Sequence, residues 1–218
     1  MERTPSGRDA PGLFSELHGW KDLVREPPVG AHILQIYEDP SREIEAATLF
    51  VTEGVRKAER VCCVGSPREL ASIRRGLGDA GLDPDRLIRR GTLALVGQLA
   101  LNGSPKHRQE TSRTAIDQFI HEMFQGVPET YPGVRWWGNR VARFFENGLF
   151  DRALAFEQLC QERREALPWS LLCAYDGRKL SPDSHAAAFW DVLRNHSHLI
   201  PAGDLGVALE LFPNGVRE

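Results

Sequence analysis

The chain alternates short apolar segments with longer segments in which apolar residues recur every three to four positions. The short segments are aliphatic or aromatic and are bounded by glycine, proline or charge, which is typical of β-strands, whereas the periodic segments predict amphipathic helices. The predicted strands are residues 32–37, 60–65, 92–96, 134–138 and 170–175, with 206–212 as a further candidate. Strands that alternate with helices usually form a largely parallel sheet covered on both faces. The pattern therefore predicts a three-layer α/β fold.

Helix start and stop signals lie between the predicted strands. Asp39 and Pro40 precede an amphipathic stretch over residues 41–57, and Ser66 can cap a helix that Gly81 closes. Further helices are predicted after Asp83-Pro84, over 111–125, over 139–167 in two parts that separate at Asn147-Gly148, and after Ser181-Pro182-Asp183. The polar stretch 102–110 predicts a loop of the kind that can act as a lid.

Residues 1–30 are rich in proline and glycine, and apolar residues recur at helical spacing between Gly12 and Arg25. This predicts a flexible N-terminal arm with a short amphipathic helix, followed by a single α/β domain over 31–218. The helix either packs on its own domain, which we favour because single apolar stripes usually find the local core, or docks on another subunit or partner.

The composition changes this picture little. Hydrophobic residues make up 41% of the chain and charged residues 26%, with a formal net charge of -3, as in ordinary soluble proteins. No apolar run is long enough to cross a bilayer, and the polar N-terminus does not resemble a secretory signal, so we expect the protein to stay in the cytoplasm. Basic and acidic residues are interspersed, so neither nucleic acid nor a membrane surface is an expected partner. The four cysteines lack paired metal spacing and read as reduced core thiols.

Ligands of open α/β sheets bind at the carboxyl ends of the strands. Side chains that can form hydrogen bonds occur there at Tyr37, Ser66, Asn139 and Tyr175, and Trp136 offers aromatic surface. Such a rim suits a small, mostly apolar or aromatic ligand. A buried ring that only ties down a loop is about as common a role for either tyrosine, but their shared location favours binding.

The roles of two further residues depend on the geometry of the elements that carry them. A strand over 32–37 puts His32 near the opposite end from Tyr37 and on the opposite face, so spacing alone favours a structural or switch role for His32. Glu157 lies on a helix expected to be partly buried. Its carboxylate is either solvated or turned into a pocket, where it could bond to a ligand or to His32.

Several chemistries lack their sequence signatures. No Gly-Lys-Ser/Thr occurs, and Gly76 to Gly81 matches the dinucleotide fingerprint only at a helix end, so a standard nucleotide-binding loop is not expected. No Gly-x-Ser-x-Gly elbow is present. His196 and His198 could form half of a metal site, but spacing supplies no third ligand. We therefore expect neither a metal nor a cofactor.

Taken in order, several segments resemble the MEDS domain, the methanogen/methylotroph DcmR-type sensory domain. They are residues 32–39, 133–138, the helix with Glu157, residues 172–176 and His196, and the resemblance covers about residues 30–200. It implies a RecA/KaiC-like α/β fold that has lost its phosphate loop. It also implies a role in sensing small molecules, proposed for the family to be hydrocarbon derivatives.

The resemblance also extends to individual residues of the family's motifs. His32 and Tyr37 match the His and Tyr of the family's first motif, and Tyr175-Asp176 matches its Tyr-Asp pair near the fifth strand. Where many relatives have Gly-Glu after the fourth strand, this chain has Gly138-Asn139. A neutral amide thus replaces a carboxylate, which argues against an inherited acid–base or cation-binding role there and points to a changed ligand.

Together these observations predict a non-enzymatic, small-molecule-sensing regulatory domain that acts through a protein partner in bacterial or archaeal signalling or transcription control, with homo-oligomerisation left open. The expected ligand-binding residues are His32, Tyr37, Ser66, Trp136, Asn139, Glu157 and Tyr175. One alternative is an interaction regulator with a vestigial pocket. A degenerate nucleotide-binding enzyme that uses His32, Glu157 or Asp176 ranks last.

Overall fold

A computed structural model describes residues 14–17, 19–97, 121, 130–164, 169–180, 186–203 and 206–212 of the chain. Within them, one eight-stranded sheet has the order β1-β8-β7-β2-β6-β5-β3-β4. The strands are β1 Phe14–Leu17, β2 His32–Tyr37, β3 Arg60–Gly65, β4 Leu93–Gly97, β5 Val134–Gly138, β6 Trp169–Asp176, β7 His198–Ile200 and β8 Ala208–Leu211. The pairs from β7 to β4 are parallel, whereas β8 pairs antiparallel with both β7 and β1. The predicted mostly parallel α/β fold is confirmed.

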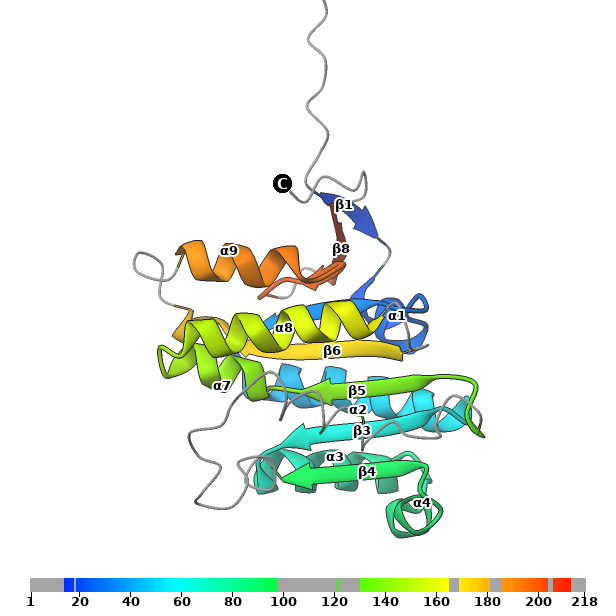
Figure 1. Ribbon diagram of the computed structural model, residues 1–218. Helices are drawn as coiled ribbons and strands as arrows, with labels where there is room; N and C mark the ends of the chain where they lie inside the picture. Colours follow the sequence, from blue (N-terminus) through cyan, green and yellow to red (C-terminus); the bar gives the residue numbers. More distant parts are fainter. Residues whose placement is uncertain are drawn as a thin grey trace, which may run out of the picture.

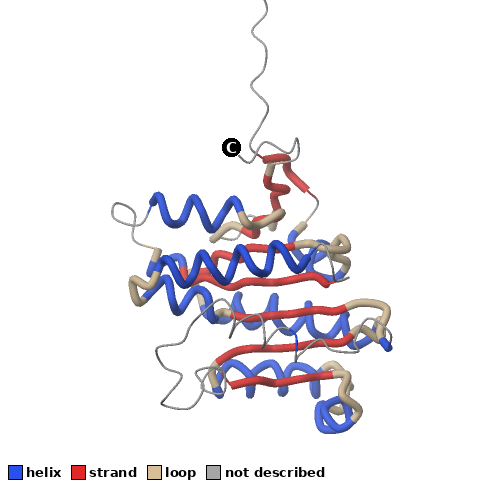
Figure 2. The backbone as a smooth tube through the Cα atoms, viewed as in Figure 1, coloured by secondary structure: helices blue, strands red, loops and turns tan. Residues whose placement is uncertain are grey.

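Helices cover both faces of this sheet (Figures 1 and 2). They are α1 Trp20–Arg25, α2 Pro40–Arg56, α3 Pro67–Asp79, α4 Pro84–Arg89, α7 Arg140–Glu146, α8 Phe150–Arg164 and α9 Ala186–Arg194, with a 3-10 turn, η3, at Gly177–Lys179. The first three pack into one hydrophobic core, and α7, α8 and α9 pack into another on the opposite face. Adjacent residues of β5 divide between the cores, since Trp136 lies in one and Trp137 in the other.

The predicted helix starts are confirmed in detail. The Asp39 carboxylate accepts a hydrogen bond from the Ser41 amide at 2.8 Å. Ser66 and Glu69 form a reciprocal capping box at the start of α3. Gly81 follows α3 with a φ of +78°, the left-handed conformation that favours glycine at this point. Local sequence signals therefore mark these boundaries in the structure.

The N-terminal helix is shorter than its pattern predicts. Residues 14–17 form the strand β1 rather than a turn of helix, because β8 offers them an antiparallel partner. α1 then packs on its own domain, and the buried Arg135 guanidinium donates to the carbonyls of Val24 and Arg25, at 2.9 Å in each case. The interpretation that the N-terminal helix packs on its own domain is thus confirmed for residues 20–25. The strand β7 was not predicted, since three residues are too few to show a pattern.

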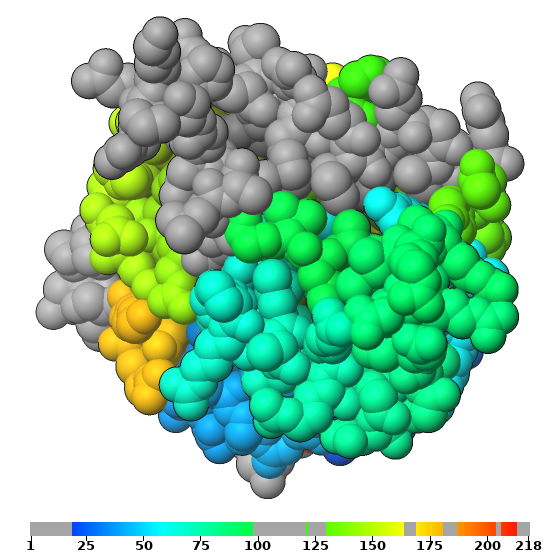
Figure 3. Space-filling model, turned by 90° about the horizontal axis from the view of Figure 1, so that it is seen from below, coloured from blue at the N-terminus to red at the C-terminus, as the bar shows by residue number. Residues whose placement is uncertain are grey.

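Other predictions fall beyond what the structure describes. The loop over 102–110, nearly all of the helix over 111–125 and the start signal at 181–183 lie outside the described residues. At the β4 edge, α3 and α4 form much of the described surface (Figure 3), and Arg74 of α3 pairs with Asp85 of α4 at 2.5 Å. In the part of the chain that is described, no helix combines the length and apolar character needed to span a bilayer.

Candidate functional site

The carboxyl ends of the parallel strands meet at one edge of the sheet. β2 and β6 are neighbours with Tyr37 paired to Asp176 at their ends. In chain order, β2 is followed by α2, which packs on one face of the sheet. β6 is followed by η3 and then by α9, which packs on the other face and precedes β7. Adjacent strands whose connections diverge in this way create the crevice where open α/β sheets bind ligands.

A cleft of about 210 Å³ opens beside the end of β2. This is smaller than the roughly 300–1,000 Å³ typical of sites for drug-sized ligands, so it matches a molecule of few heavy atoms. Its lining comes from α1, from β2, the turn after it and the start of α2, and from the end of β7 and the segment between β7 and β8. The lining residues are Trp20, Gln35, Ile36, Tyr37, Glu38, Asp39, Arg42, Ile200, Pro201, Gly203, Gly206 and Val207.

Gln35 and Tyr37 alternate with residues that face the other core, so both point toward α2. Gln35 is buried and its Nε2 donates to the Arg42 carbonyl at 3.0 Å. Among the described residues, no group donates a hydrogen bond to Gln35 Oε1. The Tyr37 hydroxyl forms a hydrogen bond with the Glu43 carboxylate. The wall of the cleft thus contains the Gln35 Oε1 acceptor, to which no described residue donates, and the Tyr37 side chain, whose hydroxyl is hydrogen-bonded to Glu43.

Glu43 is a buried carboxylate directly behind this wall. Burial, followed by the charge of Glu69, raises its pKa to about 7, although hydrogen bonds from Asn139 and Tyr37 lower it in part. Asn139 Nδ2 donates to Glu43 Oε1 at 2.9 Å. Burial and the Glu43 charge in turn raise the pKa of Tyr37 well above its ordinary value. Glu43 is therefore placed to change its protonation near neutral pH.

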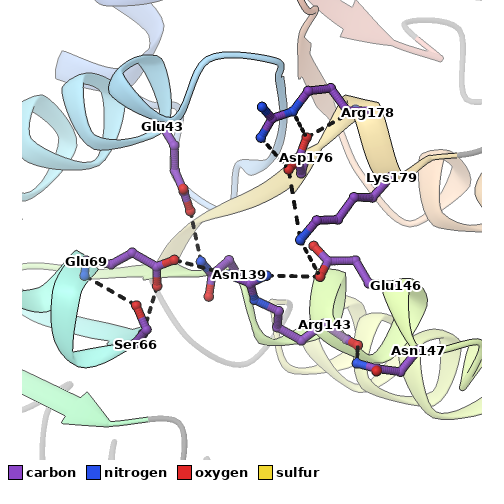
Figure 4. A network of polar contacts seen from close by, with 10 residues as sticks. All are labelled: Glu43, Ser66, Glu69, Asn139, Arg143, Glu146, Asn147, Asp176, Arg178 and Lys179. Carbon is purple, nitrogen blue, oxygen red and sulfur yellow. Dashed lines mark hydrogen bonds and ion pairs between the residues drawn. The ribbon is translucent and has the colours of Figure 1, made fainter.

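An outer network of opposite charges surrounds this buried carboxylate (Figure 4). Arg143 of α7 donates to Glu146 at 2.9 Å and to Glu69 of α3 at 3.3 Å. Asp176 accepts from the Arg178 guanidinium at 2.9 and 2.8 Å, and this pairing lowers the pKa of the Asp176 carboxyl. The network joins α2, α3, α7 and η3 around the carboxyl edge.

A second polar group lies inside the α8 side of the domain. His32 Nε2 is 3.2 Å from Glu157 Oε2 and 3.4 Å from Cys173 Sγ, and His196 Nε2 is 3.7 Å from the same Glu157 oxygen. The Tyr175 hydroxyl donates to the other carboxylate oxygen at 2.8 Å. Glu157, His32 and His196 are completely buried, and burial raises the pKa of Glu157.

A family model described as "MEDS: MEthanogen/methylotroph, DcmR Sensory domain" matches residues 31–197. The chain belongs to the MEDS family. No curated protein matches it. Among solved structures, a KaiC-like protein from the hyperthermophilic archaeon Pyrococcus horikoshii OT3 is similar, with a TM-score of 0.51 and 13% identity over 79% of this chain and 70% of that one. Identity this low shows a shared KaiC/RecA-like fold alone, while family membership indicates a sensory, regulatory role.

The structure distributes the expected binding residues of this MEDS domain over four places. Tyr37 lines the cleft, and Asn139 contacts Glu43 behind it. Ser66 caps α3, and Trp136 is buried in the core with its ring edge-on to Phe156 and Trp169. The remaining three, His32, Glu157 and Tyr175, meet in the interior. His32 is thus separated from Tyr37, as strand spacing predicted.

Sequence reasoning missed Gln35, Glu43 and Cys173. Glu43 had a usable signal, because it occupies the same helical stripe as Ala46, Ala47 and Phe50, where a solvated carboxylate is not expected. Cys173 had none, since it lies far in sequence from its neighbours in space. Of the two late histidines, His196 joins the interior group, whereas His198 Nδ1 lies 2.8 Å from Ser197 Oγ.

Within the described residues, the interior group is the one set of at least three side chains that could hold a metal ion. Its four candidate ligand atoms, from His32, Glu157, Cys173 and His196, all lie within 4.8 Å of one another. Spacing along the sequence could not reveal this group, because the candidate ligands beside His196 come from remote segments.

Proposed function

We propose that this MEDS domain senses a small organic ligand in the cleft at the carboxyl end of β2 and passes the bound state to a protein partner. The observation that carries the proposal is the buried Gln35 Oε1 in the cleft wall, which accepts no hydrogen bond from any described residue. A buried polar atom without a partner is unfavourable, so a ligand that donates to it gains affinity from that contact.

The lining supports a particular ligand class. Trp20, Ile200, Pro201 and Val207 contribute apolar surface, which favours a hydrocarbon body. The Gln35 acceptor favours a molecule with one donor group, such as a short-chain alcohol or amine. The cleft volume of about 210 Å³ restricts this molecule to a few carbon atoms.

The contacts behind the cleft support a route for the signal. Tyr37 in the wall bonds to Glu43 of α2, and Glu43 bonds to Asn139 at the start of α7. A ligand that moves the Tyr37 ring would change both bonds and so shift α7 relative to α2. If a partner binds only one arrangement of these helices, ligand binding would change the affinity of the domain for that partner.

Isothermal titration calorimetry with a panel of short-chain alcohols and amines tests the binding step. We expect at least one compound to bind, and Gln35→Leu to weaken it about tenfold or more, because this change removes the acceptor from a similar volume. Gln161→Leu, the same substitution on α8, is the matched control and should leave binding unchanged.

Two results would contradict the proposal. If no compound in the panel binds or raises the melting temperature, the cleft is not a sensor site for this class. If Gln35→Leu and Gln161→Leu bind with equal affinity, Gln35 does not contact the ligand. The first result would favour the alternative of an interaction regulator whose pocket is vestigial.

A further inference from the structure

The four interior side chains have the separations of metal ligands. In a tetrahedral zinc site, bond lengths near 2.0–2.3 Å place neighbouring ligand atoms about 3.3–3.6 Å apart. Glu157 Oε2 lies 3.2 Å from His32 Nε2 and 3.7 Å from His196 Nε2, and Cys173 Sγ lies 3.4 Å from His32 Nε2. All four candidate ligand atoms lie within 4.8 Å of one another, so rotation of the more distant side chains would bring them onto one ion.

The histidine tautomers are held in the form that a metal requires. His32 Nδ1 lies 2.8 Å from the Asn195 carbonyl oxygen, and His196 Nδ1 lies 2.7 Å from the Val192 carbonyl oxygen. A carbonyl can only accept, so in each case Nδ1 carries the proton and the Nε2 lone pair of the neutral ring turns to the centre of the group. This second-shell arrangement is typical of metal-ligating histidines.

The charges also balance around a divalent cation. A glutamate and a thiolate contribute two negative charges, and two neutral imidazoles contribute none, so one Zn²⁺ makes the buried group neutral. Without a cation, a buried carboxylate and two buried imidazoles meet away from water, with the Cys173 thiol within hydrogen-bond distance of His32 Nε2. Tyr175 donates to the outer oxygen of Glu157 and so holds the carboxylate in place.

We propose that His32, Glu157, Cys173 and His196 bind one Zn²⁺ ion in a closed, structural site. Mixed nitrogen, sulfur and oxygen ligands in tetrahedral array favour zinc over the harder Mg²⁺ and Ca²⁺. Four protein ligands leave no open position for a substrate. The ion ties β2, β6, α8 and the segment before β7 together, and it stands independently of any ligand in the cleft beside β2.

Metal titration of the full chain tests the site. Protein stripped with a chelator is titrated with Zn²⁺ and, separately, with Co²⁺, and the bound metal is counted by mass spectrometry under native conditions. We expect one ion per chain, tetrahedral visible bands of Co²⁺, and a near-ultraviolet charge-transfer band from one thiolate. Zn²⁺ should also raise the melting temperature, and a chelator should reverse the rise.

Matched variants locate the ion. Cys173→Ala should abolish the thiolate band and lower the affinity more than a hundredfold, whereas Cys62→Ala, at a buried cysteine outside the group, should retain both. His196→Gln should behave like Cys173→Ala, and His198→Gln like the unmodified chain. Tyr175→Phe should weaken binding about 10–100-fold, because it removes only the support of Glu157.

Definite outcomes overturn the proposal. Failure of the unmodified chain to bind Zn²⁺ or Co²⁺ does so without any variant, which covers the case in which a substituted chain fails to fold. A thiolate band that persists in Cys173→Ala, or an equal loss of affinity in His198→Gln and His196→Gln, places the metal elsewhere. Ligand binding at Gln35 is a separate readout, so failure of either proposal leaves the other testable.

Discussion

The carboxyl-edge network and the interior histidine group are both built from ionisable side chains, but water reaches only the first. At the edge, acids and bases alternate, as in the contacts of Arg143 with Glu146 and of Lys179 with the same carboxylate. In the interior, Glu157 lies beside two imidazoles and within 4.8 Å of the Cys173 thiol, and among the described residues no lysine or arginine pairs with it. The carboxyl-edge network balances its charge with its own side chains, whereas the interior group needs a proton or a metal ion to balance the charge of Glu157.

This difference in balance has a consequence for adaptability. Exposed pairs are screened and contribute little each, so helices at the edge can shift at small cost. Buried groups without a counter-charge tolerate few arrangements, because each lost contact leaves an unsatisfied polar atom. The edge can thus rearrange at small energetic cost, whereas the interior group favours one rigid arrangement.

The largest expected effect distinguishes the two regions directly. Glu157→Ala should lower the free energy of unfolding in the presence of Zn²⁺ by about 3–5 kcal/mol, because it leaves a cavity and removes the partner of Tyr175 and His32. Glu146→Ala, which removes a carboxylate at the edge, should cost about 1 kcal/mol or less. Urea unfolding measures both, and equal losses would contradict the contrast.

The next effect concerns Glu43, the buried carboxylate behind the edge. Its pKa is raised from 4.5 to about 7 on folding, so the folded state binds the proton more tightly. The resulting penalty is absent below pH 4.5, grows as the pH rises toward 7, and reaches about 3 kcal/mol above it. Glu43→Gln should therefore stabilise the protein at pH 8 and have little effect near pH 4.5.

Urea unfolding of both chains from pH 5 to pH 8 checks this prediction. The difference in unfolding free energy between the variant and the unmodified chain should increase with pH. A difference that stays constant over this range would show that Glu43 keeps an ordinary pKa and that the edge has no buried titrating group.

A smaller effect is expected from the hydroxyl that joins the interior group to the end of β6. Tyr175→Phe should lower the unfolding free energy by about 1–2 kcal/mol, because Glu157 loses a buried hydrogen bond of 2.8 Å. Tyr131→Phe is the matched control, with the same loss of a hydroxyl away from both regions. Thermal unfolding should place Tyr131→Phe close to the unmodified chain, and indistinguishable variants would argue against the bond.

The smallest effect belongs to Lys179 at the outside of the edge network. Its ammonium lies 3.0 Å from Glu146, and its side chain is 44% exposed. Lys179→Ala should change the unfolding free energy by about 0–1 kcal/mol, and the change should disappear in about 1 M salt. A larger effect that survives salt would mean that this pair is not screened and that the edge is as rigid as the interior.

The sequence predicted the fold well where local chemistry is decisive. Helix caps at Asp39 and Ser66 and the break at Asn147-Gly148 appear in the structure as predicted. The strand at residues 14–17 was misassigned and β7 was missed, since each depends on a partner strand distant in sequence. Family motifs identified His32, Tyr37 and Tyr175 as notable residues, but motifs carry no information on which of them meet.

The sequence by itself determined the alternation of strands and helices, the helix boundaries, and the separation of His32 from Tyr37 along a regular strand. These follow from period, capping and the 180° alternation of strand side chains, which are local properties of the chain. Only the tertiary structure decided that His32, Glu157, Cys173 and His196 converge, and that Gln35 and Tyr37 line one cleft with Glu43 behind it. Convergence of remote residues depends on strand order and register, which sequence spacing does not encode.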